Sequence, residues 1–250
     1  GPPHLSKICD VNNVSREFCA GNINIEQAER KLRSIKRARL YSDKQLLFSH
    51  LLATSGFAYV FGGGFLEAFL ALFVGLLLGL NNVYLSKIIK KSFISDLLGA
   101  AIVAVSGVAL SILVESIFNV SVGCQYIIVG SLMPLVPGTA FTGAIRDTVA
   151  GDYVSGIARI MEALIIAASV ALGVAFGLFL TDVCGSYIDV EFTLAGIHSF
   201  GIHAVFAVIF TFTAMVGFCQ VFSCPKKYYF ICCLNAAICW AIYLFCVYLG

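Results

Sequence analysis

The chain has 250 residues, of which 60% are hydrophobic and only 12% are charged, and its mean hydropathy is +0.94. Globular domains have about a quarter of their residues charged, so this composition excludes a soluble globular protein and indicates an integral membrane protein. The net charge of +2 is uninformative by itself, because in a membrane protein the placement of charges matters more than their sum.

The first 45 residues differ from the rest of the chain. They are polar and hold nine of the sixteen Lys and Arg residues. Behind a capping asparagine, Asn22 or Asn24, four apolar residues recur at helical spacing: Ile25, Ala28, Leu32 and Ile35. We interpret residues 1–45 as a soluble cytoplasmic segment with a solvated amphipathic helix that leads into the membrane. A basic surface that docks a partner is the alternative.

Beyond Gln45 the chain divides into apolar runs, each about as long as the twenty residues that a helix needs to cross a bilayer. They predict an all-α integral membrane protein with about seven transmembrane helices. The runs lie near residues 46–63, 66–86, 97–118, 126–145, 156–180, 198–222 and 228–249.

The basic residues set the predicted orientation. With the N-terminus in the cytoplasm, every Lys and Arg falls on the cytoplasmic side, including those between the runs: Lys87, Lys90, Lys91, Arg146, Arg159, Lys226 and Lys227. The outer loops hold only acidic charges, among them Asp182, Asp189 and Glu191. We therefore predict a multi-pass protein of the cell membrane with a cytoplasmic N-terminus.

A short repeat occurs at an offset of 161 residues. Residues 56–61 (GFAYVF) match residues 217–222 (GFCQVF) at four of six positions, and Phe69 matches Phe230. An odd number of predicted crossings separates the copies, so the second copy is upside down, as in many secondary transporters. We predict a 5+5 inverted repeat. Residues 46–182 then form the first five-helix repeat, and residues 183–250 form a loop and the first two helices of a second, truncated repeat.

The fourth run contains a helix break. Pro134 and Pro137, with Gly138 behind them, lie within an uncharged stretch from Ser116 to Ile145. Lipid cannot satisfy the backbone groups that a break sets free, so such a break must be buried in protein or line a wet cavity. A helix that restarts at Thr139 offers its positive end to a substrate carboxylate, and Thr139 and Thr142 add hydroxyl groups. A kink that serves packing alone is the alternative.

A cluster of charged and polar residues follows the break. They are Arg146, Asp147, Asp152, Ser155, Arg159 and Glu162. The last four share one face of the fifth helix, which continues as Ile166, Ser169 and Gly173. We predict that this cluster gates transport or couples it to protons, with Arg159 and Glu162 paired and Arg146 and Asp147 closing the network. Glu162 is either a proton carrier or part of a structural ion pair, and Asp152 is favoured as a helix cap.

The other polar side chains are weaker candidates. Glu67 and Glu115 fall near the outer boundary, where they either reach water or line a pathway. We predict no metal, no cofactor and no enzyme activity, because the histidines lack ligand spacing and no nucleophile–base pair lies at membrane depth. Most cysteines lie in apolar runs and are expected to pack as small hydrophobic residues. A bond between Cys124 and Cys184 is the one disulfide that the predicted topology leaves open.

The stretch around the break resembles the signature of the threonine/serine exporter family. The resemblance rests on Pro134-Leu135-Val136-Pro137-Gly138, Ala144-Ile145-Arg146-Asp147, Gly151-Asp152, Ser155-Gly156, Ala158-Arg159, Glu162-Ala163-Leu164 and Gly173-Val174, with Leu5, Lys7, Val11, Asn12, Ser15 and Arg16 near the start. It implies a ten-helix exporter of two similar halves, sometimes split over two polypeptides, that exports threonine and serine with the proton gradient. A split relative has been linked to succinate export. This chain then holds the first half and the opening two helices of the second.

The function hypothesis is a secondary, proton-coupled exporter of threonine, serine or small carboxylates. The substrate binds at Pro134, Pro137, Gly138, Thr139 and Thr142. The expected partners are the substrate, protons, the lipid bilayer and the missing second half or another copy of the chain, and no nucleic acid is expected. The alternative is a non-transporting membrane scaffold or receptor that docks a partner through its basic cytoplasmic segment.

Overall fold

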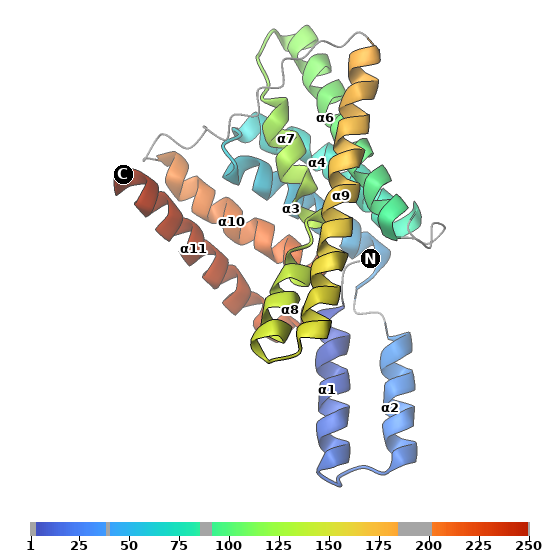
Figure 1. The fold of residues 1–250 in the computed structure, drawn as a ribbon. Coiled ribbons are helices and arrows are strands. Elements are labelled where there is room, and N and C mark those ends of the chain that lie inside the picture. Colours follow the sequence, from blue (N-terminus) through green and yellow to red (C-terminus); the bar gives the residue numbers. More distant parts are fainter. Residues whose placement is uncertain (1–3, 39–40, 86–91, 185–201, 250) are drawn as a thin grey trace.

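The computed structural model describes residues 4–38, 41–85, 92–184 and 202–249, and this part of the chain is helical, without a β-strand. Figure 1 shows a helical bundle with a two-helix hairpin projecting from one end. The elements are α1 (Leu5–Cys19), α2 (Ile25–Arg37), α3 (Asp43–Val60), α4 (Phe65–Leu80), the π-helix η1 (Asn81–Leu85), α6 (Ser92–Phe118), α7 (Cys124–Leu132), the 3₁₀-helix η2 (Met133–Leu135), α8 (Gly138–Val149), α9 (Tyr153–Val183), α10 (Ile202–Val221), the 3₁₀-helix η3 (Lys226–Tyr228) and α11 (Tyr229–Leu249).

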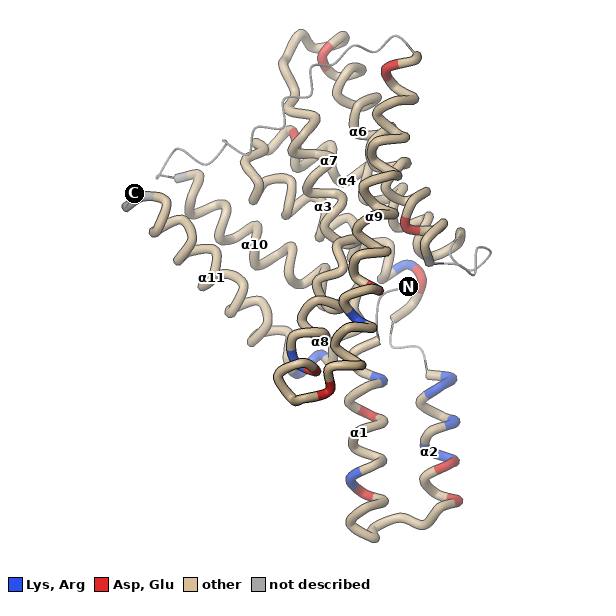
Figure 2. Tube along the Cα trace, in the orientation of Figure 1, with Lys and Arg blue, Asp and Glu red and all other residues tan. Residues whose placement is uncertain are grey.

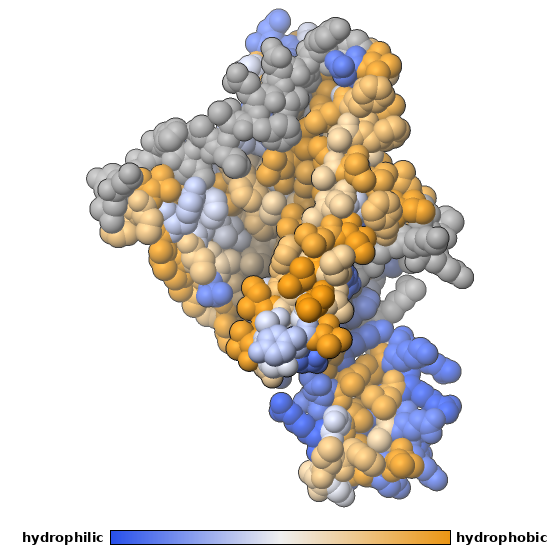
Figure 3. Space-filling model, viewed as in Figure 1, coloured by the Kyte–Doolittle hydropathy of each residue, from blue (hydrophilic) through white to orange (hydrophobic). Residues whose placement is uncertain are grey.

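The polar N-terminal segment forms the α1–α2 hairpin. Asn24 caps α2, because its Oδ1 accepts a hydrogen bond from Gln27 N at 2.8 Å and its own N–H donates to Gln27 Oε1 at 3.1 Å. This confirms the helix and one of its two predicted caps. The sequence did not predict α1, which pairs with α2 through an ion pair between Glu17 and Lys31. Hydrophilic side chains cover much of the hairpin (Figure 3).

Each predicted apolar run corresponds to a helix or a helix pair. Among the described residues, five helices are long and apolar enough to cross a membrane, and there are six if the bent α7–α8 pair counts as one span. Helix α3 lies where the first span was predicted but falls outside this set. Its buried residues include Ser49, His50 and Thr54, because α4, α7 and α10 pack around it. Helix α3 is therefore buried largely by other helices of the protein.

The main apolar core joins α4, α6 and α7, with Val74, Leu78, Val103 and Ile127 almost fully buried. Helix α9 packs against α6 through small residues, as predicted for Ser169 and Gly173. A Cβ atom on Gly173 would lie 2.3 Å from the Leu97 carbonyl oxygen, so the two backbones are nearly in contact. The outer surface of α8 to α11 is largely apolar in Figure 3, as expected of a surface that faces lipid.

The α3–α4 and α10–α11 hairpins turn in the same way. At the end of α3, Gly62 N donates to Tyr59 O and Gly63 N donates to Ala58 O, which is a Schellman motif. At the end of α10 the same two bonds recur exactly 161 residues later, from Ser223 N to Gln220 O and from Cys224 N to Cys219 O. Gly62 and Ser223 both have positive φ, at 106° and 50°. The structural likeness therefore extends through the turn, beyond the residues that match in sequence.

Helices α3 and α10 cross each other with reciprocal contacts. A Cβ atom on Gly56 would lie 2.6 Å from Ala214 Cβ, and one on Gly217 would lie 2.8 Å from the backbone nitrogen of Ala53. Ala53 and Ala214 are themselves 161 residues apart, as are Gly56 and Gly217. Such an exchange of partners in an antiparallel pair is what a two-fold axis perpendicular to both helices produces. The rings of Phe57 and Phe218 also meet, with centroids 5.2 Å apart.

Charge is divided between the two ends of the molecule. Lys and Arg residues lie on the α1–α2 hairpin and on the bundle end that joins it, whereas the end where α6 and α9 terminate shows only acidic residues (Figure 2). The predicted positions of Lys87, Lys90, Lys91, Asp189 and Glu191 lie outside the described residues. Cys124 and Cys184 are both free, so the structure does not contain the disulfide that the sequence left open.

Candidate functional site

The predicted break in the fourth span is present between η2 and α8. Pro134 and Pro137 lack the N–H groups that a continuous helix would use, and Val136, which precedes a proline, adopts an extended conformation with ψ of 131°. The axes of the two helical segments differ by 48°. Pro134, Leu135 and Pro137 are buried, so protein rather than lipid surrounds the inner side of the break.

The opposite side of the break is exposed. Val136 and Gly138 are exposed, and a Cβ atom on Gly138 would meet nothing within 4 Å. No side chain caps the N-terminus of α8. Thr139 is half-buried, while Thr142 is exposed and donates to the Gly138 carbonyl oxygen of its own helix at 2.9 Å. Of the two predicted hydroxyl groups, that of Thr139 is therefore the better placed to serve a ligand at the start of α8.

Asp147 is the centre of the charged cluster that follows the break. Its Oδ2 accepts hydrogen bonds from Arg159 Nε at 2.7 Å and from Ser155 Oγ at 2.9 Å. Its Oδ1 accepts from Arg146 Nε at 3.2 Å and from Arg146 Nη2 at 3.1 Å. Only 14% of the Asp147 side chain is exposed, so these ion pairs are better shielded than surface pairs. The cluster ties α8 to the first turns of α9.

Asp152, which the sequence favoured as a helix cap, caps the N-terminus of α9. The Asp152 side chain accepts a hydrogen bond from Ser155 N at 3.1 Å, which satisfies one free N–H group of the first turn. Asp152 is exposed, whereas Asp147, five residues earlier, is largely enclosed. The two aspartates of this turn therefore have different structural roles.

Glu162 lies apart from the cluster. The predicted pair between Arg159 and Glu162 is wrong, because Arg159 binds Asp147 instead. Glu162 is exposed on α9, and within the described part of the chain it has no ion pair or hydrogen bond. It is therefore the one member of the predicted cluster that the structure does not bring together with the others.

A buried polar group lies beside the break, and the sequence analysis did not identify it. It comprises His50 of α3, Asn81 and the half-buried Asn82 of η1, and Ser131 of α7, which lies three residues before Pro134. His50 Nε2 pairs with Asn82 Nδ2 at 3.1 Å, and Asn81 Nδ2 donates to the Ser95 carbonyl oxygen at 3.3 Å. Three buried polar atoms of this group have no hydrogen-bond partner: His50 Nδ1, Asn81 Oδ1 and Ser131 Oγ.

Gly99 shows how close this polar group comes to the break. A Cβ atom there would lie 2.8 Å from Asn81 Nδ2 and 3.6 Å from Leu135 Cδ1, so both side chains approach the same point. A π-helix such as η1 often marks a functional site. The signal in the sequence was the pair Asn81-Asn82 at the end of an apolar run, where an amide has few ready partners.

The two outer glutamates have structural roles. Glu67 accepts hydrogen bonds from Gly64 N at 2.8 Å and from Gly123 N at 3.1 Å, and it thereby joins the loop before α4 to the loop before α7. Glu115 accepts from Val122 N at 2.8 Å. Each carboxylate thus holds a loop in place through backbone N–H groups.

Comparison with known proteins places the break and the cluster within a matched region. A profile of the family described as "Putative threonine/serine exporter" matches residues 4–181. An uncharacterized protein of Schizosaccharomyces pombe is 26% identical over 181 residues, which are 69% of this chain and 21% of that protein. The threonine/serine exporter of Corynebacterium glutamicum is 23% identical over 182 residues, which are 72% of this chain and 37% of that protein.

No solved structure matches the chain. The matched region covers between 21% and 37% of the length of these two relatives, so the chain corresponds to a minor part of each.

Proposed function

The chain belongs to the threonine/serine exporter family, and on that premise we propose that it is part of a secondary active exporter of small hydroxylated amino acids in the cell membrane. The observation that carries this proposal is a broken span with buried, unpaired polar atoms beside it. A buried polar group without a partner costs about 1–3 kcal/mol, so three such groups near one break favour a polar ligand at that place.

The break supplies complementary chemistry for an amino acid. The exposed N-terminus of α8, at Gly138 and Thr139, carries the positive end of the helix dipole and suits the substrate carboxylate. Asn81 Oδ1 is an acceptor for the substrate ammonium group, and Ser131 Oγ is a partner for the substrate hydroxyl. A small dicarboxylate would leave the acceptor at Asn81 unpaired, and this favours an amino acid over it.

The cluster around Asp147 is the proposed gate. It joins α8, which begins at the break, to α9, so a movement of α8 relative to α9 must rearrange the bonds from Arg146, Ser155 and Arg159. Because Asp147 is mostly enclosed, breaking its ion pairs without water costs much free energy. Entry of water lowers that cost. Such a two-state contact suits alternating access.

Glu162 is the proposed proton carrier. A carboxylate on a transmembrane helix without a basic partner is free to bind a proton, and Glu162 lies three residues after the gate residue Arg159. Export against a concentration gradient needs an energy source, and inward proton flow supplies it. Proton coupling through Glu162 is independent of the substrate assignment and is tested separately.

The remainder of the transporter is proposed to be a second, inverted half. The reciprocal contacts of α3 and α10 and the matching turns support a repeat in which residues 46–182 are the first unit and residues 183–250 begin the second. Residues 1–45 form the cytoplasmic segment, in agreement with the basic end seen in Figure 2. A second half of this kind, or another copy of this chain, would supply the second break.

The test is transport by the full-length protein in liposomes. Labelled threonine or serine should move across the membrane when a proton gradient is imposed, and a protonophore should abolish accumulation. Asp147→Asn should slow transport at least about tenfold, because it removes the charge that holds two arginines. Asp152→Asn is the matched control, since asparagine caps helices as well as aspartate does. Equal loss in both variants would remove the gate from the proposal.

Proton coupling has its own variant. Glu162→Gln should keep substrate exchange, in which labelled and unlabelled threonine swap without a gradient, but lose the response to the proton gradient. Intact gradient-driven accumulation in Glu162→Gln would exclude this residue as the proton carrier. Failure of wild-type protein to move either amino acid would overturn the substrate assignment itself.

A further inference from the structure

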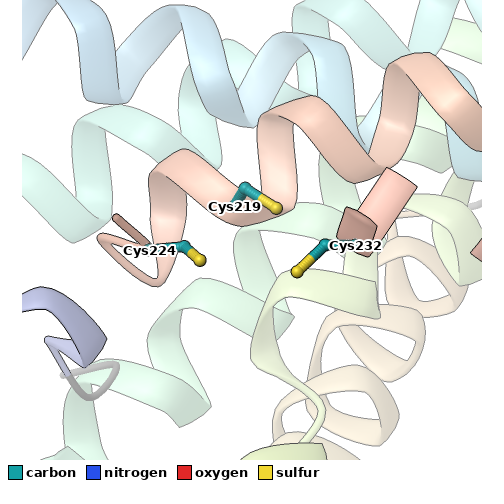
Figure 4. Close-up of side chains that lie close together, drawn as sticks. All are labelled: Cys219, Cys224 and Cys232. Carbon is teal, nitrogen blue, oxygen red and sulfur yellow. The ribbon is translucent and has the colours of Figure 1, made fainter. Parts of the chain in front are cut away.

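Three cysteine side chains converge where α10 turns into α11. Cys219 lies on α10, Cys224 lies in the turn, and Cys232 lies on α11 (Figure 4). Their sulfur atoms are all within 4.8 Å of one another, and none of the three is in a disulfide. Cys219 and Cys224 are buried, while Cys232 is half-buried. None of the three cysteines belongs to the proposed substrate site.

The backbone of the turn brings these residues together. The Schellman motif places Cys224 next to the end of α10, through the 2.7 Å bond from its N–H to the Cys219 carbonyl oxygen. In the α3–α4 hairpin the matching positions are Ala58, Gly63 and Ala71, and all three are buried. The same inward-facing positions therefore hold packed small residues in one hairpin and thiol groups in the other.

We propose that Cys219, Cys224 and Cys232 form a binding site for a soft metal ion, with Cu(I) as the best fit. Metal–thiolate bonds of about 2.3 Å place the sulfurs around one ion about 4 Å apart, close to the observed spacing. Soft thiolate ligands select Cu(I), zinc or iron–sulfur clusters. Structural zinc sites are tetrahedral, and the described part of the chain brings no fourth ligand within 4.8 Å of all three sulfurs.

The cluster has other titratable neighbours. They are Cys9 of α1, and Cys233 and Tyr229 of α11. A bound metal ion would replace thiol protons, which leave for the solvent.

The same turn anchors the cytoplasmic hairpin. Leu5 N donates to the Phe222 carbonyl oxygen at 3.1 Å, and Ser6 N donates to the Ser223 carbonyl oxygen at 2.9 Å. The Tyr41 hydroxyl group donates to the Cys224 carbonyl oxygen at 3.3 Å. Occupancy of the site by a metal ion fixes the turn and thereby stabilises the junction between α1 and the membrane bundle.

The experiment is an anaerobic Cu(I) titration of the purified, reduced protein in detergent, with a colorimetric Cu(I) chelator as competitor. One equivalent should bind, and the thermal unfolding temperature should rise with it. Cys232→Ser should weaken binding more than about 100-fold, because even loss of an outer partner of a metal ligand costs up to that factor. Cys232 is half-buried, so this variant is the least disruptive of the three.

The matched control is the double variant Cys239→Ser, Cys246→Ser. Both residues are exposed on α11, outside the cluster, and their replacement should leave Cu(I) affinity unchanged. Absence of stoichiometric binding, unchanged binding in Cys232→Ser, or an equal loss in the control would overturn the site. Displacement of Cu(I) by an equal concentration of Zn(II) would overturn the copper assignment. Because no readout involves transport, the result is independent of the proposed function.

Discussion

The α3–α4 and α10–α11 hairpins have the same backbone geometry at their turns, but different helices surround them. Both helices end in the same Schellman motif, and each presents a glycine to the other at their crossing. Yet α3 is enclosed by α4, α7 and α10, whereas α10 packs mainly against α3 and α11. The difference shows that the same turn and crossing form among different neighbours, and that the neighbours set the burial.

The contents of the two hairpins follow from this difference. Helix α3 buries His50, while the matching residue of α10 is Thr211, whose hydroxyl group bonds to the Ala207 carbonyl oxygen of its own helix. Among the described residues, the first hairpin leaves His50 Nδ1 and Asn81 Oδ1 buried without a partner beside the broken span, and the second leaves Trp240 Nε1. In the second hairpin the inward positions hold thiols. The first hairpin thus contains buried polar side chains, and the second contains a cluster of thiol groups.

The largest expected effect concerns the crossing itself. Gly56→Ala and Gly217→Ala should each lower the free energy of unfolding by about 1–3 kcal/mol, because the added Cβ atom would lie under 3.0 Å from atoms of the partner helix. Thermal unfolding in detergent measures the loss. Gly138→Ala is the control for stability, since its Cβ atom would have open space.

The double variant sharpens the comparison. If the two glycines share one crossing, the first alanine already separates the helices and the second then costs less, so the losses should be sub-additive by at least about 0.5 kcal/mol. Full additivity would mean that the two contacts are energetically independent. The reciprocal geometry would then give no support to the predicted repeat.

The second prediction separates stability from transport in the polar group beside the break, to which α7 contributes Ser131. Ser131→Ala removes a buried hydroxyl group without a partner, so the free energy of unfolding should stay the same or rise by up to about 1 kcal/mol. Substrate affinity in the transport assay should nevertheless fall about tenfold, the equivalent of one lost hydrogen bond. Thr211→Val in the second hairpin should change neither quantity by more than about 0.5 kcal/mol. Destabilisation by Ser131→Ala would show that the hydroxyl group has a structural partner instead.

Much of this arrangement could be predicted from the sequence because it depends on local chemistry. Pro134 and Pro137 lack the N–H groups that the interior of a continuous helix needs, and Asp152 caps a helix with its own side chain. The predicted pairing of Arg159 with Glu162 was wrong because helical spacing considers only partners on the same helix. The turn between α8 and α9 packs these two helices together and brings Asp147 of α8 closer.

The polar group and the thiol cluster were missed for a related reason. His50, Asn81 and Ser131 come from three helices, and the three cysteines have irregular spacing, so neither set forms a pattern along the chain. Only tertiary packing brings them together. The offset of 161 residues, by contrast, was detectable because a repeat is a relation within the sequence, although its contacts were not.

The smallest expected effect lies in the two turns. Ser223 holds a positive φ of 50° that glycine adopts more easily, so Ser223→Gly should relieve about 1 kcal/mol of backbone strain. It also removes the hydroxyl group that bonds to His4 Nδ1 at 3.1 Å, which costs about 0.5 kcal/mol. The expected result is a net gain of about 0.5 kcal/mol in the free energy of unfolding, measured in detergent.

The reciprocal change at the matching position should have the opposite sign. Gly62 has a φ of 106°, which a side chain tolerates poorly, so Gly62→Ser should lower stability by about 1 kcal/mol or more. His4→Ala separates the two contributions at Ser223, because in that background the hydrogen bond is already absent and Ser223→Gly should show the full gain. If Ser223→Gly is destabilising there too, the second turn prefers its serine for another reason, and the likeness of the two hairpins stops at their hydrogen bonds.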